Sequence, residues 1–307
     1  MSLLVVGSVA FDAVKTPSGK RDKILGGAAT YFALAASFFT DVRVVAVVGD
    51  DFTKKEEQVL RVRGVDTSGI AREKGQSFFW SGEYGESMND AKTLDTQLGV
   101  FANFNPQIPE KFKDTGYLFL ANIDPVLQLN VRRQLPAAKF VAGDTMNYWI
   151  NGSRGPLGEM MKSIHALLIN DTEAKMLAQD LSLARAAQKI LTMGPTALVI
   201  KHGEYGATVF FEDGAFGIGR HPFRAPTLPL EVVTDPTGAG DSFAGGFMGY
   251  IASQNALTRD TFKRAMFYGG VMGSFAVEAF GTERLQRLTR EEIEERYQVF
   301  RELTHIE

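Results

Sequence analysis

The chain has 307 residues, enough for one large α/β domain with an insertion, and 45% apolar and 22% charged residues are typical of a folded protein rather than a disordered one. Its 33 basic and 36 acidic side chains give a formal charge of −3, which argues against a nucleic-acid partner because phosphate binding needs a basic surface. The sequence contains no cysteine, so disulfides, thiolate metal sites and cysteine nucleophiles are excluded.

The first residues contain a short apolar run, 3–6, with no basic stretch before it. This pattern predicts a buried strand rather than a signal peptide. No stretch of 18 apolar residues is present that would predict a membrane span. We therefore expect a cytoplasmic protein without a membrane partner.

Short apolar runs alternate with helical stretches along most of the chain. The runs predict buried strands over residues 3–6, 42–48, 117–121, 140–142, 166–169 and 197–200. The stretches between them predict helices over residues 28–39, 54–63, 126–135, 155–163, 172–179 and 183–193. This alternation is typical of a mainly parallel sheet with helices on both faces, and such sheets bind ligands beyond the carboxyl ends of their strands.

Two segments, 13–25 and 70–103, interrupt this alternation with polar residues and turn formers. Within the second segment, Phe78, Trp80 and Tyr84 alternate with polar residues, which predicts a strand with one aromatic face. We interpret the two segments as a small β-sheet lid on an α/β body made of residues 1–12, 26–69 and 104–307. The alternative is a pair of surface hairpins that do not move. The aromatic strand could also join two copies of the chain into a homodimer.

Glycines gather where a further strand, predicted over residues 228–233, leads to a helix predicted over residues 242–252. Gly238, Ala239 and Gly240 would then lie at a helix N-terminus, where unpaired N–H groups and the helix dipole favour an anion. Two glycines let the backbone approach that anion closely. The pattern predicts an anion hole suited to a phosphoryl group in transfer.

Asp241 follows this hole in the first turn of the predicted helix. A carboxylate there can cap the helix, and beside an anion hole it can instead act as a general base that takes a proton from an attacking hydroxyl. We favour the base because no other carboxylate follows a Gly-x-Gly at a predicted helix start. The sequence has no Gly-x-x-x-x-Gly-Lys-[Ser/Thr] phosphate loop, no protein-kinase catalytic loop and no serine-hydrolase elbow.

Residues 235–241, Asp-Pro-Thr-Gly-Ala-Gly-Asp, resemble the second signature of the ribokinase/PfkB family of carbohydrate kinases. Five further segments resemble motifs of that family in the same order, at residues 7–12, 26–27, 49–52, 170–173 and 201–206. The resemblance implies a ribokinase-like three-layer α/β/α body with a β lid. It also implies a kinase that uses ATP and Mg²⁺.

By this resemblance, Asp12 binds substrate hydroxyls. Gly26 and Gly27 are candidate substrate-binding residues, because they let the backbone approach a polyol closely or form a hinge between lid and body. The family usually places an asparagine that contacts the sugar four residues after the second glycine, and Tyr31 holds that place here. The departure leaves the substrate open. A sugar or cyclitol is the first choice. A nucleoside is the alternative, because Tyr31 and the aromatic residues of the lid could stack on a base.

The resemblance also implies a set of nucleotide-binding residues. These are Asn170, Glu173, Lys201, Gly203, Gly206, Thr237, Ala276, Val277, Phe280 and Gly281. Within the set, Glu173 would organise Mg²⁺ through water, although it could simply be part of a helix cap. Lys201 could be solvated, and residues 276–281 could be ordinary helix packing. Asp235 is a candidate ligand for a monovalent cation such as K⁺.

We therefore expect ATP-dependent phosphorylation of a hydroxyl on a small polyol, with Asp241 as the base and Gly238, Ala239 and Gly240 as the anion hole. Two alternatives stay open. One is a nucleoside kinase of the same family, and the other is a sensor on this fold that binds sugar or nucleotide without catalysis. The intact Asp241 argues against the sensor.

Overall fold

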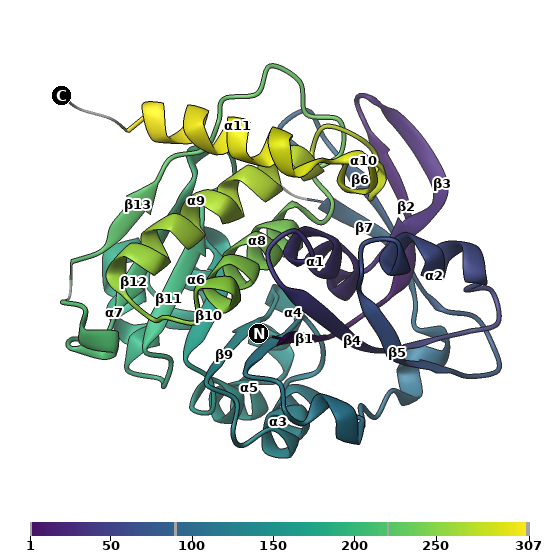
Figure 1. Cartoon of the computed structure of the whole chain (residues 1–307), viewed down its shortest axis with the longest axis horizontal. Coiled ribbons are helices and arrows are strands. Elements are labelled where there is room, and N and C mark those ends of the chain that lie inside the picture. The colour runs from purple at the N-terminus through teal and green to yellow at the C-terminus, as the bar shows by residue number, and fades with distance from the viewer. Residues whose placement is uncertain (1, 89–90, 220, 305–307) are drawn as a thin grey trace.

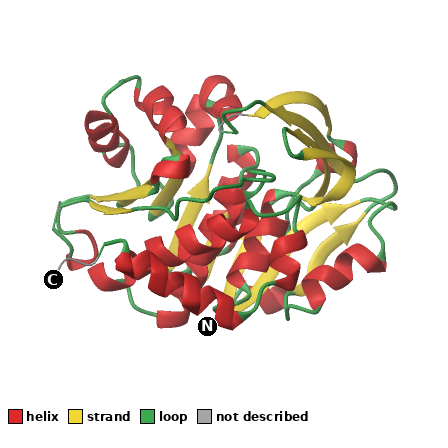
Figure 2. Ribbon diagram, turned by 90° about the horizontal axis from the view of Figure 1, so that it is seen from above, coloured by secondary structure: helices red, strands yellow, loops and turns green. Residues whose placement is uncertain are grey.

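The computed structural model describes residues 2–88, 91–219 and 221–304. Within them, nine strands form one large sheet with helices on both faces, and four strands form a small sheet to one side (Figure 1, Figure 2). The predicted three-layer α/β fold with a small separate sheet is confirmed. Residues 89–90 of the predicted lid, and residues 1, 220 and 305–307 of the predicted body, lie outside the described residues.

The large sheet contains the six buried strands that the apolar runs predict. Its strands in chain order are β1 (Ser2–Val6), β4 (Asp41–Val48), β5 (Asp66–Arg72), β8 (Tyr117–Leu120), β9 (Phe140–Asp144), β10 (Ala166–Asn170), β11 (Ala197–Lys201), β12 (Ala207–Phe211) and β13 (Phe223–Ala225). In space they follow the order β13-β12-β11-β10-β9-β8-β1-β4-β5. The strands from β11 to β5 are parallel, while β12 and β13 are antiparallel additions at one edge.

Helices cover both faces of this sheet. They are α1 (Ala28–Ala36), α2 (Lys54–Arg61), α3 (Pro125–Gln134), α4 (Asn147–Gly152), α5 (Arg154–Met161), α6 (Asp171–Ala178), α7 (Leu183–Leu191), α8 (Ala239–Gln254), α9 (Arg259–Ala276), α10 (Glu283–Arg287) and α11 (Arg290–Glu302). Short 3₁₀ turns are η1 (Gly99–Asn103), η2 (Glu110–Phe112), η3 (Gly203–Tyr205) and η4 (Ala215–Gly217). None of the helices in the described ranges has the length and apolar character needed to cross a membrane.

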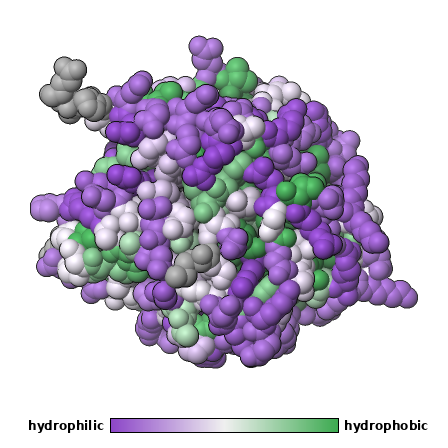
Figure 3. All heavy atoms as spheres, viewed as in Figure 1, coloured by the Kyte–Doolittle hydropathy of each residue, from purple (hydrophilic) through white to green (hydrophobic). Residues whose placement is uncertain are grey.

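Two apolar cores hold the layers together. On one face, α1, α8 and α9 pack on the sheet, where Phe32 stacks on Phe119 of β8 with ring centroids 4.3 Å apart. On the other face, α3, α5, α6 and α7 bury side chains such as Val131 and Ile190. Hydrophilic side chains cover most of the face shown in Figure 3. Burial of apolar surface on both faces explains why the central strands are almost purely apolar.

The small sheet has the order β3-β2-β6-β7, built from β2 (Ala10–Thr16), β3 (Gly19–Gly26), β6 (Phe78–Tyr84) and β7 (Ala91–Gln97). The predicted aromatic strand is β6. Its Phe78 packs on Phe101 of η1, within the segment 70–103, and its Tyr84 reaches Thr237 in the body of the same chain.

The sheet boundaries differ from the predicted lid boundaries at three places. Gly26, expected in the body, is the last residue of β3 and pairs with Ala10. Residues 10–12, expected in the body, pair with β3 and β6 of the small sheet. Residues 70–72, expected in the lid, pair with β4 in the large sheet. The apolar pair Ala10 and Phe11 fits a strand of either sheet, so its pattern does not decide between them.

The strand predicted over residues 228–233 is wrong, because this stretch has no regular secondary structure. Pro226 precedes it and Pro229 lies within it. Proline has no N–H to donate to a strand ladder, which explains why the apolar character of the stretch does not produce a strand. The helix predicted after it is confirmed as α8.

Candidate active site

The start of α8 forms the centre of the candidate site, beyond the carboxyl ends of the large sheet's strands. Gly238 is its N-cap and has a φ of 75°, a left-handed conformation that favours glycine. A Cβ at this position would lie 2.4 Å from the ring of Tyr31. Glycine therefore lets the buried Tyr31 ring lie directly against the loop backbone.

The N–H groups predicted to form the anion hole differ in whether they already donate a hydrogen bond within the protein. The Ala239 N–H donates to the Pro236 carbonyl at 3.2 Å, while the Ser242 N–H begins the helical ladder by donating to Gly238. Among the described residues, no backbone acceptor pairs with the Gly240 N–H. The start of α8 thus keeps a donor for an anion, and the Ala239 bond has to break before that N–H can join it.

Asp12 lies on β2 and is buried against Gly26, the last residue of β3, and Gly27, the next residue along the chain. A Cβ on Gly26 would lie 1.8 Å from the Asp12 Oδ2 atom, so any larger residue would collide with the carboxylate. Gly27 has a φ of 93° and caps α1. Burial, together with the charges of Asp235 and Asp241, raises the pKa of Asp12 to about 7.

Asp241 lies in the first turn of α8, and its charge contributes to the raised pKa of Asp12. Burial and the neighbouring Asp144 raise the pKa of Asp241 to about 7, against the opposing effect of Lys201. The Lys201 ammonium lies 3.7 Å from Asp144 Oδ2. Burial alone would lower the pKa of Lys201, but Asp144, Glu173 and Asp241 together raise it. One ammonium therefore faces three carboxylates.

Glu173 and Asn170 form a helix cap at the start of α6. The Asn170 N–H donates to Glu173 Oε2, and the Glu173 N–H donates to Asn170 Oδ1, both at 2.8 Å. Burial and the charge of Asp144 raise the pKa of Glu173 to about 7. Its other carboxylate oxygen keeps its lone pairs, so capping and a role toward a cation are compatible.

Asp235 joins two loops beneath the start of α8. Its Oδ1 accepts from the Thr237 N–H and its Oδ2 accepts from the Gly281 N–H, each at 2.9 Å. The Thr234 N–H donates to the Val277 carbonyl at 2.8 Å. Each carboxylate oxygen of Asp235 therefore has one protein donor and lone pairs left for a cation.

The other predicted nucleotide-side residues contact mainly protein. Arg21 of β3 lies 4.5 Å above the Phe280 ring, and Ala276 is fully buried at the end of α9. Gly203 and Gly206 have positive φ values of 57° and 90° in the turn between β11 and β12. They shape the backbone beside Lys201, and Phe280 joins the small sheet to the body.

Two site residues were missed by the sequence reasoning. Asp144 ends β9, and a carboxylate directly after a buried strand is a signal that could have found it. Tyr84 comes from β6, and its hydroxyl accepts a hydrogen bond from Thr237 Oγ1 at 3.2 Å across a sequence separation of 153 residues. Nothing local in the sequence indicates that contact.

Several buried polar atoms near the strand ends have no hydrogen-bond partner. In the described part of the chain they include Tyr31 Oη, Asn122 Oδ1, Thr145 Oγ1 and Ser242 Oγ. Unpaired buried polar groups are unfavourable, and a bound ligand can satisfy them. No group of three His, Asp or Glu side chains within the described ranges could hold a metal by itself.

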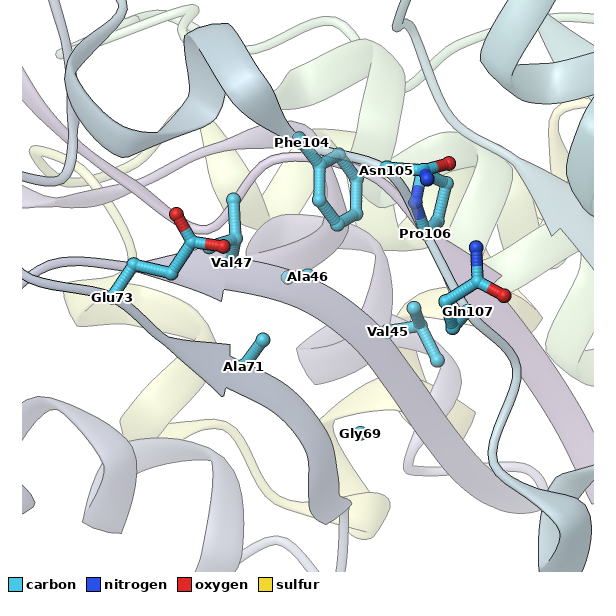
Figure 4. A pocket seen from close by; sticks show the side chains of 10 residues that line it. All are labelled: Val45, Ala46, Val47, Gly69, Ala71, Glu73, Phe104, Asn105, Pro106 and Gln107. Carbon is cyan, nitrogen blue, oxygen red and sulfur yellow. The ribbon is translucent and has the colours of Figure 1, made fainter.

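Two hollows on the surface lie away from this site. One, of about 150 Å³, lies between β4, β5 and the segment 104–107, where Val47, Ala71 and Phe104 form its apolar part and Glu73 its acidic rim (Figure 4). Another, of about 690 Å³, lies beside Arg132 and His165, at the amino ends of β10 and β11. Neither contains Asp12 or Asp241.

Comparisons with known proteins identify the family of the chain. The model of the pfkB family of carbohydrate kinases matches residues 2–287. The chain is 30% identical over 255 residues to a cytidine kinase of Thermococcus kodakarensis, covering 81% of this chain and 87% of that protein.

Solved structures share the fold. A nucleoside kinase of Burkholderia thailandensis in complex with inosine superimposes with a TM-score of 0.75 at 19% identity, covering 97% of this chain and 98% of that chain. A protein described as ribokinase II from E. coli, in complex with ATP and Mg²⁺, gives a TM-score of 0.78 at 18% identity, covering 97% and 99%. The chain therefore belongs to the pfkB family of carbohydrate kinases and is a phosphotransferase.

Proposed function

We propose that this kinase transfers the γ-phosphoryl group of ATP to a hydroxyl of a nucleoside. The observation that carries the phosphoryl transfer is the pair of buried carboxylates, Asp12 and Asp241, whose pKa values both rise to about 7 beside an anion-binding helix start. The cytidine kinase relative and the inosine-bound neighbour support a nucleoside as the acceptor. A nucleoside was the alternative acceptor in the sequence analysis, where a sugar or cyclitol was the first choice, so the proposal favours that alternative.

In this proposal each carboxylate has one task. Ionised Asp12 accepts hydrogen bonds from ribose hydroxyls, and its position beside Gly26 and Gly27 keeps it facing the acceptor. Asp241 takes the proton of the attacking hydroxyl, since a base with a pKa near the working pH both holds and releases protons readily. The start of α8 stabilises the charge on the transferred group.

The donor side fits a nucleotide with Mg²⁺. Asp144 and Glu173 both lie near one ammonium, Lys201, and burial together with the charge of Asp144 raises the pKa of Glu173. These two carboxylates would hold Mg²⁺ through water, because no cluster of three ligating side chains occurs in the described part of the chain. When bound, Mg²⁺ neutralises charge on the phosphates. Lys201 supplies a further positive charge toward them.

A turnover panel tests the proposal. Purified protein is given Mg-ATP with cytidine, other nucleosides, ribose and inositol, and ADP release and product mass are followed. We expect nucleoside monophosphate as the product, with kcat/KM at least about tenfold above that of ribose or inositol. A tenfold ratio corresponds to about 1.4 kcal/mol of transition-state binding from the base. Preferred turnover of a sugar or cyclitol would contradict the nucleoside assignment, and tight binding without ADP release would favour a sensor.

A further inference from the structure

The segment 233–237 leads into the anion-binding start of α8 without any regular secondary structure. One set of its contacts comes from the body. The N–H groups of Thr234 and Asp235 both donate to the Val277 carbonyl, and the Asp235 carboxylate accepts from Gly281. These bonds hold one side of the segment.

The other side of the segment is held by the small sheet. Thr16 Oγ1 of β2 donates to the Thr234 carbonyl at 2.8 Å, and Ser18 Oγ donates to the Val233 carbonyl at 3.3 Å. Thr237 Oγ1 donates to the Tyr84 hydroxyl of β6 at 3.2 Å. The small sheet therefore contacts the segment at three successive points, the last of them one residue before Gly238.

Tyr84 is suited to this contact because it is a largely buried, neutral phenol. Burial raises its pKa to about 12, and the charges of Asp235, Asp12 and Asp241 act in the same direction. A neutral hydroxyl can accept from Thr237 and still donate a proton of its own. Tyr84 thus joins the small sheet to the loop without adding charge beside three aspartates.

We propose that Tyr84 and Thr16 are positioning residues for phosphoryl transfer, and that docking of the small sheet completes the anion-binding start of α8. The inference rests on the proposed transfer from ATP but not on the identity of the acceptor. In the undocked state the segment keeps only its body contacts, so the N–H groups after it are less well fixed. An acceptor whose binding brings the small sheet into contact with the segment 233–237 therefore also orders the anion hole that stabilises the transferred group.

Tyr84→Phe is the direct test, because it removes one hydroxyl and keeps the ring. The matched control is Thr93→Val, which removes a hydrogen bond of the same length, 3.2 Å from Trp80 Nε1, that lies wholly within the small sheet. We expect kcat of Tyr84→Phe to fall about 5- to 10-fold, the loss of one ordinary hydrogen bond from the transition state. The KM for ATP should change less than kcat, and Thr93→Val should stay within about twofold of the wild type.

Thr237→Val closes a double-mutant cycle with Tyr84→Phe. If the two hydroxyls act through their shared hydrogen bond, the double variant loses no more than either single variant. Losses that multiply would overturn the inference, as would wild-type kcat in Tyr84→Phe or an equal loss in Thr93→Val.

Amide hydrogen exchange of a peptide spanning residues 232–242 gives a second readout that needs no acceptor. We expect faster exchange in ligand-free Tyr84→Phe than in the wild type and Thr93→Val. Equal exchange in all three proteins would overturn the inference. If the turnover panel shows a sugar rather than a nucleoside as the acceptor, the proposed acceptor fails, and the kcat comparison is made with that sugar.

Discussion

Polar side chains are paired differently at the two ends of the large sheet's strands, the amino edge and the carboxyl edge. At the amino edge, the hollow of about 690 Å³ is basic. Arg132 Nε there donates to the Ser163 carbonyl at 2.9 Å, and His165 Nδ1 accepts from the Val141 N–H at 2.9 Å. Basic side chains at the ends of α3 and α5 also offset the negative helix C-termini. Arg132 and His165 at the amino edge therefore have hydrogen-bond partners within the protein.

At the carboxyl edge the opposite holds. Asp12, Asp241 and Glu173 all have a pKa raised to about 7, and the hydroxyl of Tyr31 is buried without a partner. Such groups destabilise the fold unless a ligand satisfies them, which is typical of functional sites. At the proposed site the signal is therefore buried, unpaired polar chemistry rather than either of the two hollows described above.

The largest expected effect at the carboxyl edge comes from Asp241→Asn. We expect turnover to fall by at least about 10²-fold, because a general base contributes about 10²–10⁴-fold and the amide cannot take the proton. Binding of ATP, followed by calorimetry, should change little. Turnover near the wild-type value would remove Asp241 as the base.

Asp12→Asn should act mainly on acceptor binding. Loss of charged hydrogen bonds to hydroxyls raises the KM for the acceptor about 10- to 100-fold. Initial-rate kinetics over a range of acceptor concentrations measure it, and an unchanged KM would mean that Asp12 does not contact the acceptor.

The same variant should be more thermostable than the wild type at high pH. The pKa of Asp12 is about 7 in the folded protein and about 4 in the unfolded chain. Between these values the folded state keeps a proton that the unfolded state releases, so the free energy of unfolding of the wild type falls as pH rises. The Tm difference between Asp12→Asn and the wild type should therefore grow from pH 5 to pH 8. A constant difference would contradict the raised pKa.

The smallest effect is expected at the amino edge. Arg133→Ala and Lys162→Ala remove exposed charges from the larger hollow. Both should leave kcat/KM within about twofold of the wild type and shift stability by no more than about 0.5 kcal/mol. A tenfold loss of activity in either variant would show that this edge also works in the reaction.

Much of the fold was predictable because its central strands are short apolar runs. The stretch 228–233 misled because its apolar residues are accompanied by Pro229, and the small sheet's boundary was misplaced because Ala10 and Phe11 fit either sheet. Local patterning alone does not settle such cases.

The proposed site was predicted from one local motif at Gly238 and Asp241. Asp144 and Tyr84 escaped because their roles depend on partners far along the chain, Lys201 and Thr237. The raised pKa values were equally hidden, since they arise from burial and from carboxylates that only the fold brings together.

The pH dependence of kcat/KM is the sharpest test of the proposed roles of Asp12 and Asp241, because kcat/KM reports the ionisation of the free enzyme. The pKa values of Asp12 and Asp241 are both raised to about 7, and protonation removes the base and the hydroxyl acceptor. We expect kcat/KM to fall at least about tenfold per pH unit below pH 7. A profile that stays flat from pH 7 down to pH 5 would contradict it.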